Sequence, residues 1–226
     1  MSSTAIGIVL GILVGLRHAF EPDHLTAVST LVAESHSSRQ GVLLGALWGV
    51  GHTISLVVVG VTLALVGATL PRRVGVAFEL GVAVMLLGLG ARAIASALRA
   101  TPGPAGSTPV APGHTHAPFH VHRSILQLRR DRRRWRPLAV GLVHGLAGSG
   151  ALTAIVFTQL PGIAARILYM TLFGAGSIVG MAIASGAAGI ALQAVARSPA
   201  ARRHLALTTG ILSMTVGVLW GLPLVM

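Results

Sequence analysis

A histidine and an aspartate–histidine pair lie close together near the start of the chain, within a long apolar segment. His18, Asp23 and His24 belong to the octapeptide RHAFEPDH, and another histidine, His52, lies in the next apolar segment. Three imidazoles and one carboxylate suit nickel, cobalt, zinc or copper, and suit magnesium or calcium poorly. Neutral pH supplies uncharged imidazoles, which can bind such an ion through a ring nitrogen. These four residues are therefore predicted to form a transition-metal site.

The helix that carries this motif is not expected to be regular. Arg17, Glu21 and Asp23 carry charge, and each charged side chain costs roughly 2.5–3.5 kcal/mol deep in a bilayer. On an ideal helix, His18 and Asp23 would be about 140° apart and would not converge. Pro22 lacks an amide hydrogen and clashes with the carbonyl four residues earlier. We therefore predict a break at Pro22 that turns the histidine and the acid–histidine pair toward one point.

The depth of the histidines along their helices supports the same site. His18 lies about 21 Å from Thr4 along a straight helix, and His52 lies about 18 Å from Gln40. Both positions are inside a hydrocarbon layer about 30 Å thick, so His52 can approach His18.

Two further polar residues are candidates for an auxiliary role, or for lining the pathway by which an ion reaches this site. Glu21 lies within the motif, and His144 lies in the second half of the chain. Either His144 lines the pathway, or it forms a hydrogen bond across helices in the manner of many membrane histidines.

Residues 101–136 differ in composition from the rest of the chain. They begin with a linker rich in proline and glycine and end in the arginine-rich run LRRDRRRWR. Between these lie four histidines within nine residues: His114, His116, His120 and His122. Such a cluster can capture transition metals weakly, although a solvated linker that happens to be rich in histidine is the alternative. The arginine run is interpreted as an anchor on anionic membrane lipids, and no nucleic-acid partner is expected.

The composition indicates whether the protein folds in water or in a membrane. Of 226 residues, 53% are hydrophobic and 10% are charged, and the mean hydropathy is +0.80. Soluble domains carry about 25% charged residues, and disordered chains are polar, so both classes are excluded. The absence of cysteine excludes disulfides, iron–sulfur clusters and thiolate metal sites. The chain is therefore predicted to be an all-α integral membrane protein.

Apolar segments long enough to cross a bilayer predict six transmembrane helices. They lie at about 4–33, 40–69, 74–99, 137–160, 163–195 and 204–225.

An internal repeat relates the two halves of the chain. The segment GLRHAFEPDHLTAV at 15–28 is similar to GLVHGLAGSGALTAI at 141–155, and LWGVGHT at 47–53 is similar to LFGAGSI at 172–178. Each half contains an odd number of spans, so the second half runs inverted. Two inverted three-helix repeats are typical of transporters that bind their substrate between the repeats.

The domain organisation and the topology follow from this repeat. Residues 1–100 are predicted to form the first three-helix repeat, which carries the metal-binding motif. Residues 101–136 form the linker, and 137–226 form the second repeat. The arginine excess marks 101–136 as cytoplasmic and both termini as external, in a multi-pass protein of the inner (plasma) membrane.

The run RHAFEPDH at 17–24 resembles the signature helix of the nickel–cobalt transporter family, in which RHA and an acidic residue precede a second acid and a histidine. GHT at 51–53 resembles the family's second motif, and HGLAGSGAL at 144–152 is similar to the small urease-accessory-like members. The uptake permeases have eight spans. Six spans and a histidine-rich central loop look more like the efflux branch and the small members. The resemblance implies that nickel or cobalt crosses the membrane, with the four predicted ligands at the metal.

We therefore expect a secondary transporter of Ni²⁺ or Co²⁺, in which the ion is the substrate, no prosthetic group is bound and no enzymatic reaction occurs. No Walker motif is present, so the chain is not expected to hydrolyse ATP. Protonation of the ligands would weaken metal binding and offers a route to proton coupling.

Several alternatives stay open at this point. The direction of transport is unresolved, and efflux with metal sensing by the loop histidines is one version. A membrane protein that delivers metal for urease or hydrogenase without transport is another. A haem protein with His18, His52 or His144 as axial ligands is a third. The metal preference, the coupling ion and the oligomeric state are not determined by the sequence.

Overall fold

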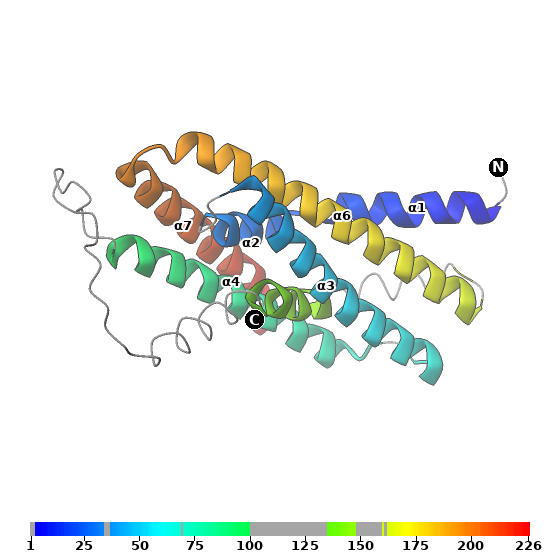
Figure 1. Ribbon diagram of the computed structural model, residues 1–226. Coiled ribbons are helices and arrows are strands. Elements are labelled where there is room, and N and C mark those ends of the chain that lie inside the picture. Colours follow the sequence, from blue (N-terminus) through cyan, green and yellow to red (C-terminus); the bar gives the residue numbers. More distant parts are fainter. Residues whose placement is uncertain (1–2, 34–36, 69, 100–134, 148–159, 161) are drawn as a thin grey trace, which may run out of the picture.

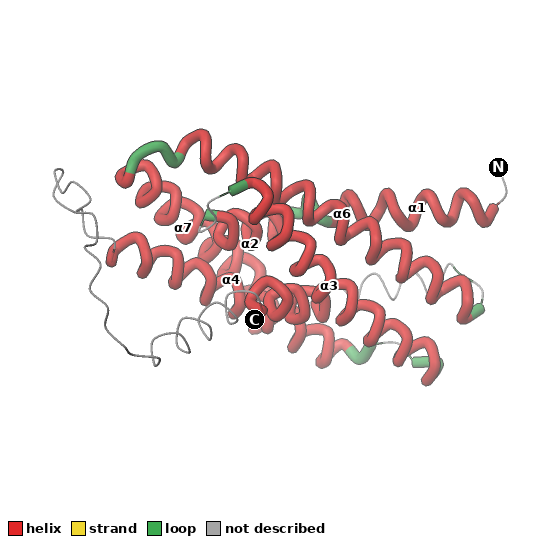
Figure 2. Tube along the Cα trace, in the orientation of Figure 1, coloured by secondary structure: helices red, strands yellow, loops and turns green. Residues whose placement is uncertain are grey.

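The computed structural model describes residues 3–33, 37–68, 70–99, 135–147, 160 and 162–226. Every regular element in this part of the chain is a helix (Figures 1 and 2). The elements are α1 (Ser3–His18), α2 (Pro22–Val32), α3 (Ser38–Val66), α4 (Arg72–Arg99), α6 (Ile163–Val195) and α7 (Pro199–Val225). Residues 135–147 form a further helix. The predicted all-α class is confirmed over the described residues.

Four of these helices are long and apolar enough to cross a membrane, namely α4, α6, α7 and the Ser38–Leu63 part of α3. A helix of 27 residues, such as α7, is about 40 Å long, which exceeds the hydrocarbon thickness of a bilayer. Together with the composition, these helices identify a membrane-embedded protein. They agree closely with four of the six predicted spans. The predicted span 137–160 is described only as far as residue 147.

The first predicted span is two helices rather than one. Helix α1 ends at His18, and Pro22 is the first residue of α2. Glu21 is the N-cap and has extended backbone angles, with φ −65° and ψ 150°. Proline is favoured at the first helical position because its missing amide hydrogen has no partner to lose there. The predicted break at Pro22 is confirmed.

Local sequence signals set the ends of the long helices. The Ser37 hydroxyl accepts a hydrogen bond from the Gln40 amide (3.2 Å) at the start of α3. In the same way, the Ser198 hydroxyl accepts one from the Ala201 amide (3.1 Å) at the start of α7. Gly67 ends α3 in the left-handed conformation, with φ 67°, which favours glycine.

The helices pair mainly across the two halves of the chain. Helix α3 packs chiefly against α6, α4 against α7, and α1 against α6. The short helix α2 packs against α6 and α7 and also contacts α4 and α3 (Figure 1). The two halves are therefore interlocked and are not two bundles standing side by side.

Glycines allow the closest crossings of these helices. Gly15 of α1 lies directly against the backbone carbonyl of Phe173 in α6. Gly141 lies in the same way against the carbonyl of Trp48 in α3. Small residues let membrane helices approach to backbone contact.

These two crossings are equivalent under the internal repeat. Gly15 aligns with Gly141, and Phe173 aligns with Trp48. A second pair of contacts supports the equivalence, because Gly176 lies against the carbonyl of Ile12 just as Gly51 lies against that of Leu138. The equivalence covers these crossings, while the complete six-helix inverted repeat stays a prediction.

The glycine crossing makes a testable prediction about stability. A Cβ atom at Gly15 would collide with the Phe173 backbone, whereas one at Gly88 of α4 would meet nothing within 4 Å. Overpacking of this kind costs about 1–3 kcal/mol. We expect Gly15→Ala to lower the thermal unfolding midpoint in detergent, and the matched control Gly88→Ala to leave it unchanged or slightly higher. Equal midpoints for the two variants would contradict the described crossing.

Candidate metal centre

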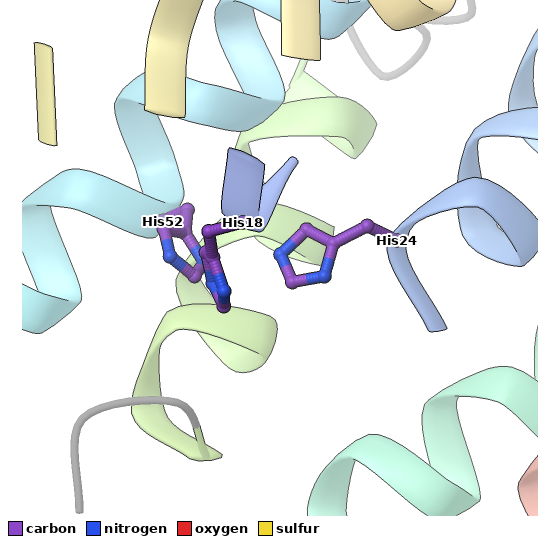
Figure 3. Close-up of side chains that lie close together, drawn as sticks. All are labelled: His18, His24 and His52. Carbon is purple, nitrogen blue, oxygen red and sulfur yellow. The ribbon is translucent and has the colours of Figure 1, made fainter. Parts of the chain in front are cut away.

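Three histidines from three helices converge at the break between α1 and α2 (Figure 3). His18 is the last residue of α1, His24 lies in the first turn of α2, and His52 lies in the middle of α3. Each offers one ring nitrogen, and these nitrogens lie within 4.8 Å of one another. The ring centroids of His18 and His24 are 4.4 Å apart, and those of His24 and His52 are 5.4 Å apart. A single ion between them can therefore be reached from all three helices.

The local structure explains this convergence. The turn between α1 and α2 keeps two backbone hydrogen bonds, from the Phe20 amide to the Arg17 carbonyl (2.9 Å) and from the Glu21 amide to the His18 carbonyl (3.1 Å). This short turn brings His24 back beside His18. On the opposite side, Gly145 lies against the backbone of His52, which brings the helix of residues 135–147 next to the cluster.

A second group of ligand atoms adjoins the first. Asp23, His24 and His144 each offer one atom, and these atoms also lie within 4.8 Å of one another. One oxygen of the Asp23 carboxylate is 3.1 Å from His24 Nδ1, and the other is 2.9 Å from His144 Nε2. All three residues are buried. Asp23 therefore joins a histidine of the first half to a histidine of the second half.

The cluster contains polar nitrogens that lack partners. Within the described residues, no hydrogen-bond partner is present for these buried atoms: His18 Nε2, His24 Nε2, both ring nitrogens of His52, His144 Nδ1 and Trp48 Nε1. Leaving a buried polar group unpaired costs about 1–3 kcal/mol. Neutral imidazole keeps one nitrogen free as an electron-pair donor. A bound transition-metal ion would satisfy such nitrogens.

Carboxylates support two of the three histidines. Glu21 Oε2 is 3.1 Å from His18 Nδ1, and Asp23 Oδ1 is at the same distance from His24 Nδ1. In both cases the Nε2 atom is left for a ligand. A carboxylate behind a metal-binding histidine fixes the ring and raises its basicity, and it is a recurrent feature of metal sites. Two carboxylates also offset the charge of a divalent ion.

The site is closed on most sides and open near Glu21. The side chains of His24 and His52 are 1% and 0% exposed, whereas His18 is 14% exposed and Glu21 is 52% exposed. This difference makes Glu21 and His18 the accessible edge of the cluster.

The structure brings together the residues that the sequence singled out. His18, Asp23, His24 and His52 converge, and His144 joins them through Asp23. Glu21 contacts His18. Metal ligation by these residues stays a prediction. The loop histidines His114, His116, His120 and His122 lie outside the described residues.

One residue of the site was not predicted. The fully buried Trp48 ring lies beside His24 and His144, with centroids 5.4 Å and 5.6 Å away. Its position one turn before His52, in a helix without other tryptophans, is the signal that the sequence offered.

These features define a class of protein, namely a membrane-embedded helical protein with a buried cluster of histidines and carboxylates at a helix break. The chain is 31% identical over 212 residues to the urease accessory protein UreH of Bacillus sp. (strain TB-90). The aligned region covers 93% of this chain and 88% of the relative. The chain therefore belongs to the UreH family. No family model matches the chain, and no solved structure matches it significantly.

His24 belongs to both groups of ligand atoms, so its removal tests the cluster most directly. We expect His24→Ala to weaken Ni²⁺ and Co²⁺ binding by more than about 100-fold, which exceeds the 10- to 100-fold loss typical of an outer partner. Isothermal titration calorimetry of the detergent-solubilised protein measures these metal affinities. His204→Ala, at an exposed position of α7, is the matched control and should bind like the wild type. Equal affinities for the two variants would contradict a metal site at this cluster.

Proposed function

We propose that this protein moves divalent nickel or cobalt ions across the membrane as a secondary transporter, with the ion as its substrate. The observation that carries the proposal is the buried cluster of His18, His24 and His52 at the break between α1 and α2. Ionisable residues inside membrane segments are costly and mark substrate pathways. Broken helices at membrane depth are tolerated where they line such a site.

The chemistry of the cluster supports a borderline transition metal. Imidazole nitrogens with carboxylates behind them suit nickel and cobalt better than magnesium or calcium. The relative is named a urease accessory protein, and this likeness favours nickel, the metal of urease, over the other borderline ions. Cobalt enters the proposal through the resemblance of the RHAFEPDH and GHT motifs to the nickel–cobalt transporters.

The packing supports a particular division into moving parts. The glycine crossings hold α1, α3 and α6 together, whereas α4 packs chiefly with α7. Helix α2 contacts members of both groups and carries Asp23 and His24. We propose that access to the site changes when these two groups move relative to each other. Movement of one half of the chain as a unit would instead require the α3–α6 contact to separate.

The remaining parts of the proposal concern topology and chemistry. Six membrane passes in two inverted repeats, with residues 101–136 in the cytoplasm and both termini outside, complete the scheme for a plasma-membrane protein. The ion crosses unchanged, so the protein is not an enzyme and needs no prosthetic group. The arginine run before residue 137 holds the loop at anionic lipids.

A second candidate function is favoured by the name of the relative. A urease accessory protein could bind nickel at the same cluster and hand it to enzyme assembly without moving it across the membrane. Transport and delivery make different predictions for flux, although both require metal binding.

Flux into liposomes separates the two functions. Purified protein is reconstituted, Ni²⁺ or Co²⁺ is offered under an imposed pH gradient, and uptake is followed with an internal metal-sensitive dye. We expect wild-type protein and the control His204→Ala to transport the ion, and His18→Ala to fall at least tenfold because a cluster ligand is lost. Binding without flux in the wild type would favour the delivery function. A Soret absorption band in the purified protein would favour the haem alternative.

A further inference from the structure

We propose that Asp23, His24 and His144 form a second metal position, adjoining the first and sharing His24 with it. The inference rests on the proposed function, and it gives the ion two successive positions inside the protein. The first is made by His18, His24 and His52, and the second contains a ligand from the other half of the chain.

The geometry places His24 between the two positions. Its ring centroid is 4.4 Å from that of His18 and 4.1 Å from that of His144. The rings of His52 and His144 are farther apart, at 6.1 Å. An ion can therefore exchange His18 and His52 for Asp23 and His144 while His24 serves both positions, through Nε2 in the first and through Nδ1, the nitrogen that faces Asp23, in the second.

The donor atoms of the second position suit an ion. Asp23 directs one carboxylate oxygen to each of the two histidines, at 3.1 Å and 2.9 Å. His144 is 2% exposed, and Nε2 is the ring nitrogen that it presents to Asp23. Support of His24 alone would need only one oxygen of Asp23. The other oxygen instead faces Nε2 of a second buried imidazole, so Asp23 lies between two ring nitrogens that can each direct an electron pair toward an ion.

The internal repeat gives an independent reason. Gly15-Leu16-Arg17-His18 aligns with Gly141-Leu142-Val143-His144, so His18 and His144 are equivalent residues of the two halves. Each lies three residues beyond a glycine that contacts the neighbouring long helix. The two equivalent histidines thus approach the single His24 from the two halves. His52 has no such counterpart, because Ser177 occupies the equivalent position.

Sharing His24 has a consequence for occupancy. Neutral imidazole offers one electron pair for a metal at a time, so the two positions exclude each other and the cluster holds one ion. Removal of the ligands specific to one position should leave the other able to bind. Transport, in contrast, should require both positions.

Trp48 provides a readout next to both positions. Its ring lies within 5.6 Å of the His24 and His144 rings, and the other two tryptophans, Trp135 and Trp220, are exposed. In a background with Trp135→Phe and Trp220→Phe, quenching of Trp48 emission by Co²⁺ reports binding at the cluster. Replacement of the four loop histidines by alanine in the same background removes a competing metal ligand, and Co²⁺ absorption then gives the stoichiometry.

Three variants in this background test the proposal. His52→Ala removes the first position. His144→Gln removes the imidazole of the second position and keeps an amide that can donate to Asp23. We expect each single variant to bind one Co²⁺, with up to tenfold weaker affinity than the parent, and the double variant to bind at least 100-fold more weakly. Flux in liposomes should fall at least tenfold in each single variant.

Distinct outcomes overturn the proposal. If His52→Ala alone abolishes Co²⁺ binding, or if His144→Gln transports like the parent, Asp23 and His144 only position His24 and no second metal position exists. If the binding pattern is as expected but the parent itself moves no ion, the second position stands and the transport function fails.

Discussion

The break at Pro22 is the constraint on which the histidine cluster depends. An unbroken helix would separate His18 from Asp23 by about 140° around its axis. Because Pro22 begins a new helix with Glu21 as its N-cap, the chain turns within three residues and returns His24 to the side of His18. The same turn gives each of these histidines a carboxylate behind it. The helix break at Pro22 thus positions both histidines and the carboxylates that contact them.

Close backbone crossings then supply the remaining members of the cluster. His52 lies in a long, regular helix and contributes only because neighbouring helices come near enough to face it. Gly141 and Gly145 bring the helix of residues 135–147 onto α3 at Trp48 and His52, and this approach carries His144 to Asp23. A methyl group at either glycine would hold the helices apart. The polar cluster and the small residues around it are therefore parts of one arrangement.

Much of this could be predicted from the sequence, because hydropathy and proline act locally. The bounds of the long helices, the break at Pro22 and the convergence of His18, Asp23, His24 and His52 all follow from local signals. The pairing of helices could not be predicted, since an apolar segment does not indicate which neighbour it contacts. For the same reason the bridge from Asp23 to His144 and the place of Trp48 beside the cluster were not foreseen.

The interlocking of the two halves has a consequence for how the protein is made. A ribosome delivers α1, α2, α3 and α4 to the membrane before their main partners α6 and α7 exist. The glycine faces of α1 and α3 then lack their helix partners until the second half is synthesised, because the backbone that packs against them belongs to α6 and to the helix of residues 135–147. Asp23 likewise has no His144 to contact during this interval. Assembly of the buried cluster is thus a late event of biosynthesis, and half a chain carries the motif without the surroundings that it needs.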